Sequence, residues 1–207
     1  MGQSTYEIEW ERQRTRTGLP PNHLAVHRWY LRLDKPWEVA DRDPPTDGLT
    51  IMRAHDPSVA FYRFLYHTAG EEFVWGDRRR MSDEQLSSLI KDPDVHVMVL
   101  YKQGTPAGFF DINFSDPNET EIKYFALLPG FIGGGLGSYM LTQSIRYAGQ
   151  RKVPLILDTC TLDHPSALEN YRKRGFVVYD EDDEEYPDPR LDGTIRRDAG
   201  QHVPLAE

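Results

Sequence analysis

The stretch EIKYFALLPGFIGGGLGSYML, residues 121–141, decides the fold. It begins as a strand, which Pro129 ends because proline cannot donate to a sheet ladder. Four glycines then lie within five positions (133, 134, 135 and 137), and a helix follows to about Gln150. Glycine permits positive φ and close backbone approach, and the first turn of a helix offers N–H groups that have no intrahelical partner. This order predicts an anion site for a phosphate.

Spacing separates this loop from two other phosphate-binding motifs. A Walker A loop needs Gly-Lys-Ser/Thr, but Leu136 follows Gly135. A G-x-G-x-x-G fingerprint also fails, because Ser138 and Met140 stand where the last glycine is required. A flexible glycine loop without a ligand is the remaining alternative. The unbroken order of strand, proline, glycines and amphipathic helix favours the phosphate site.

Working outward, the hydrophobic pattern predicts an α+β fold with a mixed sheet and helices on its faces. Strands are predicted over 23–33, 48–53, 95–101, 106–114, 119–128, 153–157 and 176–179. Helices are predicted from Asp56-Pro57 to Gly70, from a capping box at Ser82–Gln85 to about 90, and over 165–174. Residues 180–185 (DEDDEE) are expected to form a solvated loop.

Composition limits the class of protein and its surroundings. The 207 residues fit one domain with an extended terminus, or at most two very small domains. The net charge of −9 argues against nucleic-acid binding. No apolar run is long enough for a membrane helix, and the N-terminus lacks the apolar segment of a secretory signal. With one cysteine no disulfide is expected, which suggests a cytoplasmic location. We divide the chain into an N-terminal arm, strand and loop (1–48), a core domain (49–180) and an acidic C-terminal tail (181–207).

The central stretch resembles motif A of the GCN5-related N-acetyltransferase (GNAT) superfamily. Leu127-Leu128-Pro129 matches the strand end of that motif, and Gly135-Leu136-Gly137 matches its G-x-G. The stretch ALENYRKRGF, 167–176, resembles motif B in Ala167, Tyr171, Gly175 and Phe176. The resemblance covers roughly residues 50–180. The chain departs from the family pattern at Ile132, where Gln or Arg is usual, and at Gly134, where many members have Arg or Lys.

The resemblance implies a GNAT-like fold with a mostly antiparallel sheet, a splayed parallel strand pair and helices on both faces. It implies an acyltransferase that moves an acetyl group from acetyl-CoA, as co-substrate, to a primary amine of a small molecule, with no metal. The residues expected to bind CoA are Leu127, Leu128, Ile132, Gly133, Gly134, Gly135, Leu136, Gly137, Ser138 and His164. His164 is equally suited to cap the helix that Pro165 starts.

The implied reaction needs a base, an acid and an oxyanion donor. Glu121 lies eight residues before Pro129, where the family often places the base, and Asp111 and Tyr124 are alternatives. Tyr171 is the expected acid, since a phenol near ~10 can protonate a thiolate whose thiol is near ~8.5. The Leu128 N–H is the expected oxyanion donor, because Pro129 has none. Cys160 with His164 does not predict a nucleophile, and His23 with His27 lacks a third metal ligand.

The acceptor side is expected to include Tyr62, Trp75, Arg78 and Asp111. Arg78–Arg80 are suited to grip a carboxylate or phosphate, and equally to form a solvated surface. The N-terminal strand is expected either to cover this side or to pair with a second subunit in a homodimer. Two alternatives stay open: a non-catalytic acyl-CoA-binding or regulatory domain of the same fold, and an enzyme that acetylates protein or peptide amines.

Overall fold

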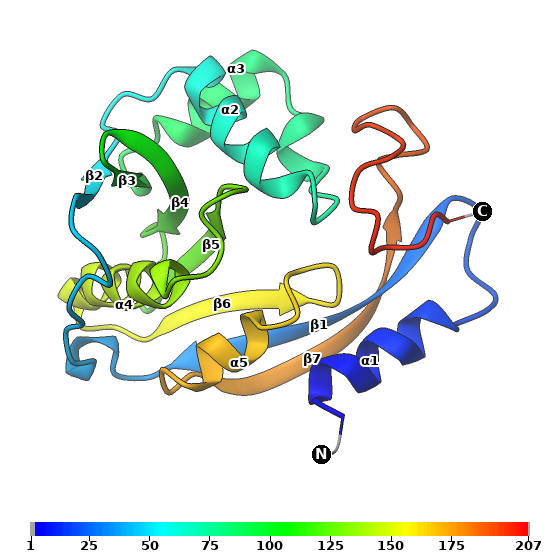
Figure 1. The fold of residues 1–207 in the computed structure, drawn as a ribbon, viewed down its shortest axis with the longest axis horizontal. Helices are drawn as coiled ribbons and strands as arrows, with labels where there is room; N and C mark the ends of the chain where they lie inside the picture. The colour runs from blue at the N-terminus through cyan, green and yellow to red at the C-terminus, as the bar shows by residue number, and fades with distance from the viewer. Residues whose placement is uncertain (1–2, 207) are drawn as a thin grey trace. The chain divides into compact units, whose positions relative to one another are not determined.

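The computed structural model describes residues 3–206. Five α-helices and seven strands are present in this range (Figure 1). The helices are α1 (Thr5–Arg14), α2 (Val59–Gly70), α3 (Asp83–Ile90), α4 (Leu136–Ala148) and α5 (Ala167–Arg172). The strands are β1 (His23–Leu33), β2 (Leu49–Arg53), β3 (Val95–Lys102), β4 (Thr105–Asn113), β5 (Thr120–Leu127), β6 (Leu155–Cys160) and β7 (Val177–Pro187). Short 3₁₀ helices are η1 (Pro36–Glu38), η2 (Asp77–Arg79) and η3 (Gly149–Arg151).

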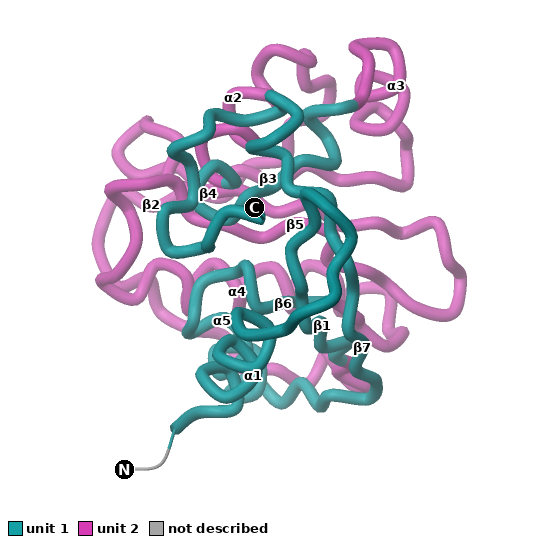
Figure 2. The backbone as a smooth tube through the Cα atoms, turned by 90° about the vertical axis from the view of Figure 1, so that its right-hand side faces the viewer, with its two compact units in different colours: residues 1–31, 70–80, 158–207 teal, residues 32–69, 81–157 magenta. Residues whose placement is uncertain are grey.

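The strands form one mixed sheet in the order β2-β3-β4-β5-β6-β1-β7. Strands β2 to β5 pair antiparallel, and β5 pairs with β6 in parallel. The predicted α+β class with a mixed sheet is confirmed. The chain divides into two compact units, residues 1–31, 70–80 and 158–207 (unit 1) and residues 32–69 and 81–157 (unit 2), which Figure 2 colours separately.

Unit 2 is built on β4, which is buried along almost its whole length. Successive side chains of a strand point to opposite faces, so Phe109 and Asp111 share one face and Gly108 the other. Helix α2 covers the first face, where Tyr62 contacts Phe109 edge-on and bonds to Asp111. Helix α4 covers the second face, where Met140 lies against Gly108. The sheet of unit 2 therefore has helices on both faces.

The helix starts of unit 2 follow capping chemistry. The predicted capping box of α3 is confirmed, since Ser82 and Gln85 exchange side-chain and backbone hydrogen bonds. The predicted start of α2 at Asp56-Pro57 is wrong. Ser58 caps this helix instead, and its Oγ accepts from the Phe61 N–H at 3.2 Å. The Asp56 carboxylate forms an ion pair with Lys91, which leaves it unsuited to cap the helix.

In unit 1, residues 180–185 are largely exposed, as expected, but the expectation that they form a loop is wrong. These residues belong to the strand β7, which neighbours β1 in the sheet. The Arg12 guanidinium pairs with Asp183 at 2.6 Å, and the Arg28 guanidinium pairs with Glu184 at 2.7 Å. Cations on α1 and β1 compensate the repulsion of the acidic run, so a strand forms despite its composition.

The described segments before β1 and after β7 are also ordered in unit 1. Residues 5–14 of the predicted arm form α1, which starts in a Ser4–Glu7 capping box. The segment after β7 is packed, because the buried Arg190 pairs with the buried Asp188 at 2.7 Å. Arg190 also donates to the Val203 carbonyl at 2.7 Å. Residues 188–206 are therefore held by a buried ion pair and by apolar contacts that include Ile195, Ala199 and Val203.

Candidate active site

The glycine-rich loop has the backbone that its sequence predicts. Gly133, Gly134 and Gly135 have φ of +100°, +58° and +82°. Side chains disfavour this left-handed region, so a continuous run of it requires glycine. Gly135 is the N-cap of α4 and supplies no side-chain hydrogen bond to the helix start. The N–H groups of the first turn of α4 therefore remain suited to a ligand.

The loop has room for a phosphate group. A Cβ built on Gly133 or Gly134 meets nothing within 4 Å, so open space borders the backbone there. A Cβ on Gly137 would pack 3.6 Å from Leu127, which places the helix start against the end of β5. Successive N–H groups and the positive end of the helix dipole suit a diphosphate. No cationic side chain belongs to the loop itself, because Ile132 and Gly134 stand at the positions where charge would help.

Strand β5 leads into the glycine loop through Leu127 and Leu128, two of the residues predicted to bind CoA. Its residues Thr120–Ile122 lie opposite Leu155–Leu157 of β6. A bulge follows, because Tyr124 pairs with Asp111 while Ile122 pairs with Ile112, so Lys123 is inserted between them. A bulge bends its strand and increases the local twist. The bend redirects the segment that carries Leu127 and Leu128.

The expectation that the Leu128 N–H meets the oxyanion is wrong. This N–H donates to the Ala107 carbonyl of the neighbouring strand segment at 2.9 Å. In an antiparallel pair, hydrogen-bonded and non-hydrogen-bonded residues alternate. By this alternation Ala126 faces β4 with its N–H, and Leu127, opposite Gly108, directs its N–H away from β4. Leu127 is therefore the better oxyanion donor, and only the register of the strand reveals this.

The predicted base, Glu121, is partly exposed on β5. Its Oε1 accepts from Lys123 Nζ at 3.1 Å, and its side chain keeps 26% of its accessible surface. Because a water molecule can reach this carboxylate, it is suited to accept a proton through water.

Three residues with predicted roles lie together in unit 2. Tyr62 and Asp111 are predicted on the acceptor side, and Asp111 and Tyr124 are the predicted alternatives to Glu121 as the base. The Tyr62 hydroxyl donates to Asp111 Oδ2 at 2.5 Å, and both side chains are fully buried. The Tyr66 hydroxyl lies 3.4 Å from that of Tyr124, whose ring meets Tyr66 edge-on. Tyr124 is partly exposed and lies opposite Asp111 in the sheet. The result is a buried carboxylate surrounded by phenol rings, a combination that favours cations.

The predicted acid, Tyr171, lies on α5 in unit 1. Its side chain is buried and meets Phe176 edge-on at 6.0 Å. Burial raises the pKa of this phenol well above its usual value, and the carboxylate of Asp163 raises it further. The phenol stays protonated at neutral pH, but the raised pKa also makes it a weaker acid toward a thiolate than a free phenol.

The other predicted site residues of unit 1 have local roles. His164 accepts from the Ser166 N–H at 3.2 Å, so it orders the turn before α5. Helix α5 begins at Ala167 rather than at Pro165. Arg78 is buried and Trp75 partly buried in the segment 70–80. Burial raises the pKa of the Cys160 thiol, which disfavours the thiolate that a nucleophile needs.

The comparisons with known proteins agree with this geometry. The model of the acetyltransferase (GNAT) family matches residues 62–176. This chain belongs to the GNAT family of acetyltransferases. No curated protein sequence matches it significantly. Among residues 3–206, no helix is long and apolar enough to cross a membrane.

Solved structures share the fold at low sequence identity. A conserved Staphylococcus epidermidis protein described as functionally unknown matches with a TM-score of 0.60 and 19% identity, over 91% of this chain and 69% of that one. A GCN5-related N-acetyltransferase from Sphaerobacter thermophilus gives 0.58 and 17%, over 88% of this chain and 56% of that one. A GCN5-related N-acetyltransferase from Kribbella flavida matches with a TM-score of 0.55 and 16% identity, over 91% of this chain and 66% of that one. The chain therefore spans 56–69% of the length of these three neighbours.

Proposed function

We propose that this protein transfers an acetyl group from acetyl-CoA to a primary amine of a small molecule. The observation that carries the proposal is the run of left-handed glycines at 133–135, which ends at a helix start without a side-chain cap. Acetyl-CoA carries a diphosphate, and this backbone suits it. The segment also lies inside the stretch that the family model matches.

The CoA diphosphate would be held by the N–H groups of residues 133–138. Its pantetheine arm would follow the backbone of Leu127 and Leu128. Affinity then depends on backbone donors, since Ile132 and Gly134 bring no charge, and charge-assisted contacts are the stronger ones. His164 and Ile132 remain proposed as outer contacts of the CoA molecule.

In the proposed reaction, the amine nitrogen attacks the acetyl carbonyl carbon directly. The oxyanion accepts the N–H of Leu127, the C–S bond breaks, and the departing sulfur takes the proton of the Tyr171 hydroxyl. The proton lost by the amine passes to Glu121 through water. An alkylammonium near ~10 and a glutamic acid near ~4.3 make direct transfer steeply uphill, which is why a relay or a deprotonated amine is required.

The acceptor is proposed to be cationic before it reacts. Asp111 is a fully buried carboxylate among Tyr62, Tyr66 and Tyr124, and such groups recognise an ammonium ion. Trp75 and Arg78 remain proposed acceptor contacts. One structural neighbour with a TM-score of 0.53 and 15% identity, over 64% of this chain and 90% of that one, is an aminoglycoside acetyltransferase. Polyamino sugars therefore belong in a substrate screen.

The test is thiol release from acetyl-CoA with a panel of amines, followed by mass spectrometry of the products. Glu121→Gln should lower turnover by about 100-fold if Glu121 is the base. Glu119→Gln is the matched control. Glu119 directly precedes β5, and its carboxylate also pairs with a cation, Arg32, at 3.3 Å. Equal rates in the two variants would remove Glu121 from its role.

The absence of a cationic side chain at Ile132 and Gly134 of the glycine-rich loop favours a second function. A non-catalytic acyl-CoA-binding domain needs the glycine backbone but neither Glu121 nor Tyr171. Acetyl-CoA binding without thiol release for any small amine or peptide would support this function. Release with lysine peptides but not with small amines would instead make the protein a peptide acetyltransferase.

A further inference from the structure

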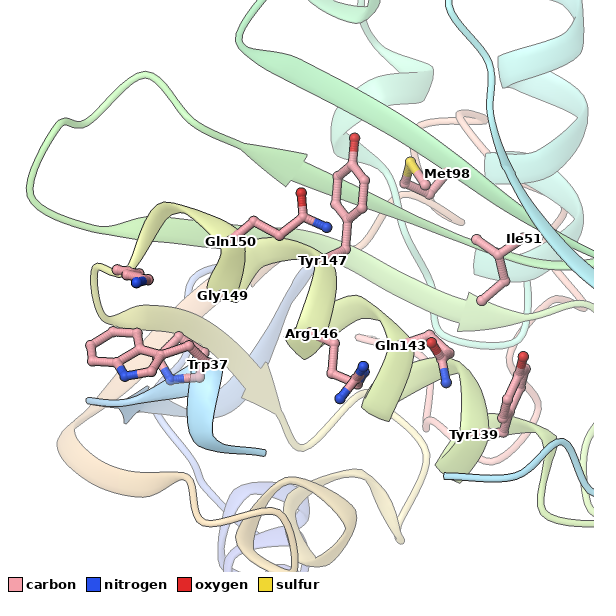
Figure 3. A pocket seen from close by; sticks show the side chains of 11 residues that line it. Trp37, Ile51, Met98, Tyr139, Gln143, Arg146, Tyr147, Gly149 and Gln150 are labelled. Atoms are coloured by element: carbon pink, nitrogen blue, oxygen red, sulfur yellow. The ribbon is translucent and has the colours of Figure 1, made fainter. Parts of the chain in front are cut away.

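A pocket of about 690 Å³ lies within unit 2 and runs along α4 from Tyr139, in the first turn of the helix, to Gly149. Figure 3 shows that its walls come from α4 and η3, from η1, and from β2 and β3. Tyr139, Gln143 and Tyr147 share one side of α4, since positions four apart in a helix are neighbours. Ile51 and Met98 supply the floor from the strands. The volume is in the range that small-molecule sites occupy, roughly 300–1,000 Å³.

The apolar part of this pocket suits a flat ring. Trp37 lines the pocket and remains 41% exposed, so its indole offers an apolar surface to a ligand. Its backbone is anchored tightly, because a Cβ on Gly149 would lie 2.8 Å from the Trp37 nitrogen. Lys152 follows Gly149 by three residues, is exposed, and lines the same pocket as Trp37.

The polar part of the pocket is positive and rich in donors. Its lining includes Arg146 and Lys152 and no carboxylate. Arg146 is neutralised by Asp41 at 3.3 Å, and Gln143 donates to the same carboxylate at 2.8 Å. The Lys152 ammonium, by contrast, has no ion-pair or hydrogen-bond partner among residues 3–206. An anionic group of a ligand would accept a charge-assisted hydrogen bond from this ammonium.

We propose that this pocket is a second binding site, which takes a small aromatic carboxylate. The ring lies against Trp37 at the η3 end of the pocket, and the carboxylate accepts from Lys152 Nζ. This site does not depend on the proposed acetyl transfer, since none of its lining residues belongs to the glycine loop or to the proposed catalytic set.

The test uses isothermal titration calorimetry with three probes that share one ring. Indole-3-acetate is anionic, indole-3-acetamide is neutral and tryptamine is cationic. We expect indole-3-acetate to bind with the highest affinity and tryptamine with the lowest. Tryptamine binding as tightly as the acetate, or no binding of any probe, would overturn the proposal.

Substitutions of two pocket residues test whether the probe binds in this pocket. Lys152 has φ of +56°, so Lys152→Asn removes the charge with a residue that tolerates this conformation. We expect it to weaken indole-3-acetate binding about tenfold, the worth of one charge-assisted contact. Trp37→Ala should weaken it about as much. The matched controls are Lys102→Asn and Phe64→Ala, which change an ammonium group and an exposed aromatic side chain outside the pocket. Circular dichroism verifies that each variant is folded.

Two further outcomes decide the location. Saturation with acetyl-CoA should leave the affinity for indole-3-acetate unchanged. Competition between the two ligands would overturn the proposal, because the probe would then occupy the CoA site. Binding that survives both Lys152→Asn and Trp37→Ala would overturn it as well.

Discussion

The Tyr62 hydroxyl donates a hydrogen bond of 2.5 Å to Asp111, and neither side chain is exposed to solvent. The pair joins the helix α2 to the central strand β4. A buried carboxylate is stable only when donors replace its water. The bond therefore fixes the acceptor-side helix to the sheet and keeps the carboxylate in one position.

Removing this donor should cost stability. We expect Tyr62→Phe to lower the free energy of unfolding by about 2–3 kcal/mol, because a buried charged acceptor loses a hydrogen bond. Urea denaturation followed by circular dichroism measures it. Tyr66→Phe is the control, since the Tyr66 hydroxyl makes a longer contact of 3.4 Å to another hydroxyl. A similar decrease in the free energy of unfolding in both variants would show that the Tyr62–Asp111 bond stabilises the fold no more than the Tyr66 contact does.

The elements that a local pattern defines were predictable from the sequence. The capping box at Ser82–Gln85, the alternating strand at residues 23–33 and the glycine loop before α4 are all encoded within a few residues. The start of β7 was predicted at residues 176–179, but its extension through the acidic run was not predictable, because that run is compensated by Arg12 and Arg28, more than 150 residues away in the chain. The destination of the Leu128 N–H depends on strand register, and the meeting of Tyr62 with Asp111 depends on how α2 packs on the sheet. Residue types alone do not specify register.

The glycine loop predicts a specific pair of variants. Gly135→Ala places a side chain at φ of +82°, and Gly193→Ala does the same at +79° in unit 1. Both should lose about 1–2 kcal/mol of stability from backbone strain. Only Gly135→Ala should weaken acetyl-CoA binding, by about tenfold or more, because only that strain distorts the proposed diphosphate site. Calorimetric titration of both variants measures this difference, and parallel losses would argue against a site at the loop.

The acidic strand predicts a pH dependence. The Arg12 guanidinium beside Asp183 holds the pKa of that carboxyl well below its usual range, and the His27 ring lowers it further. A depressed folded-state pKa adds stability above the unfolded value near ~3.9, and that stability is lost as the pH falls toward the folded-state value. The carboxylate is about one-third exposed, so the effect should stay below about 1 kcal/mol.

Thermal unfolding of wild type and Asp183→Asn checks this dependence. Above pH ~5 the wild type should have the higher melting temperature, and the difference should shrink as the solution becomes more acidic. A difference that grows on acidification would have the wrong sign. It would mean that β7 is not held by the ionised carboxylate.

The proposed acid predicts a loss of rate without a loss of binding. Tyr171→Phe should lower kcat by about 100-fold, because the departing thiolate loses its proton donor. The affinity for acetyl-CoA should change little, since the phenol is proposed to act on the sulfur as it leaves. Steady-state kinetics together with calorimetry separate the two effects. An unchanged kcat would assign Tyr171 to packing against Phe176.

The central claim is that the backbone of residues 133–138 holds the diphosphate of acetyl-CoA, and one titration tests it most directly. Calorimetry compares acetyl-CoA with S-acetylpantetheine, which keeps the thioester and the arm but lacks the diphosphate and the adenosine 3′-phosphate, and with acetyl-dephospho-CoA, which lacks only the 3′-phosphate and should bind nearly as tightly as acetyl-CoA. The account predicts one site per chain for acetyl-CoA and at least about 100-fold weaker binding of S-acetylpantetheine, the worth of roughly 3 kcal/mol of anion contacts. Equal affinities for acetyl-CoA and S-acetylpantetheine, or no heat with acetyl-CoA, would contradict it.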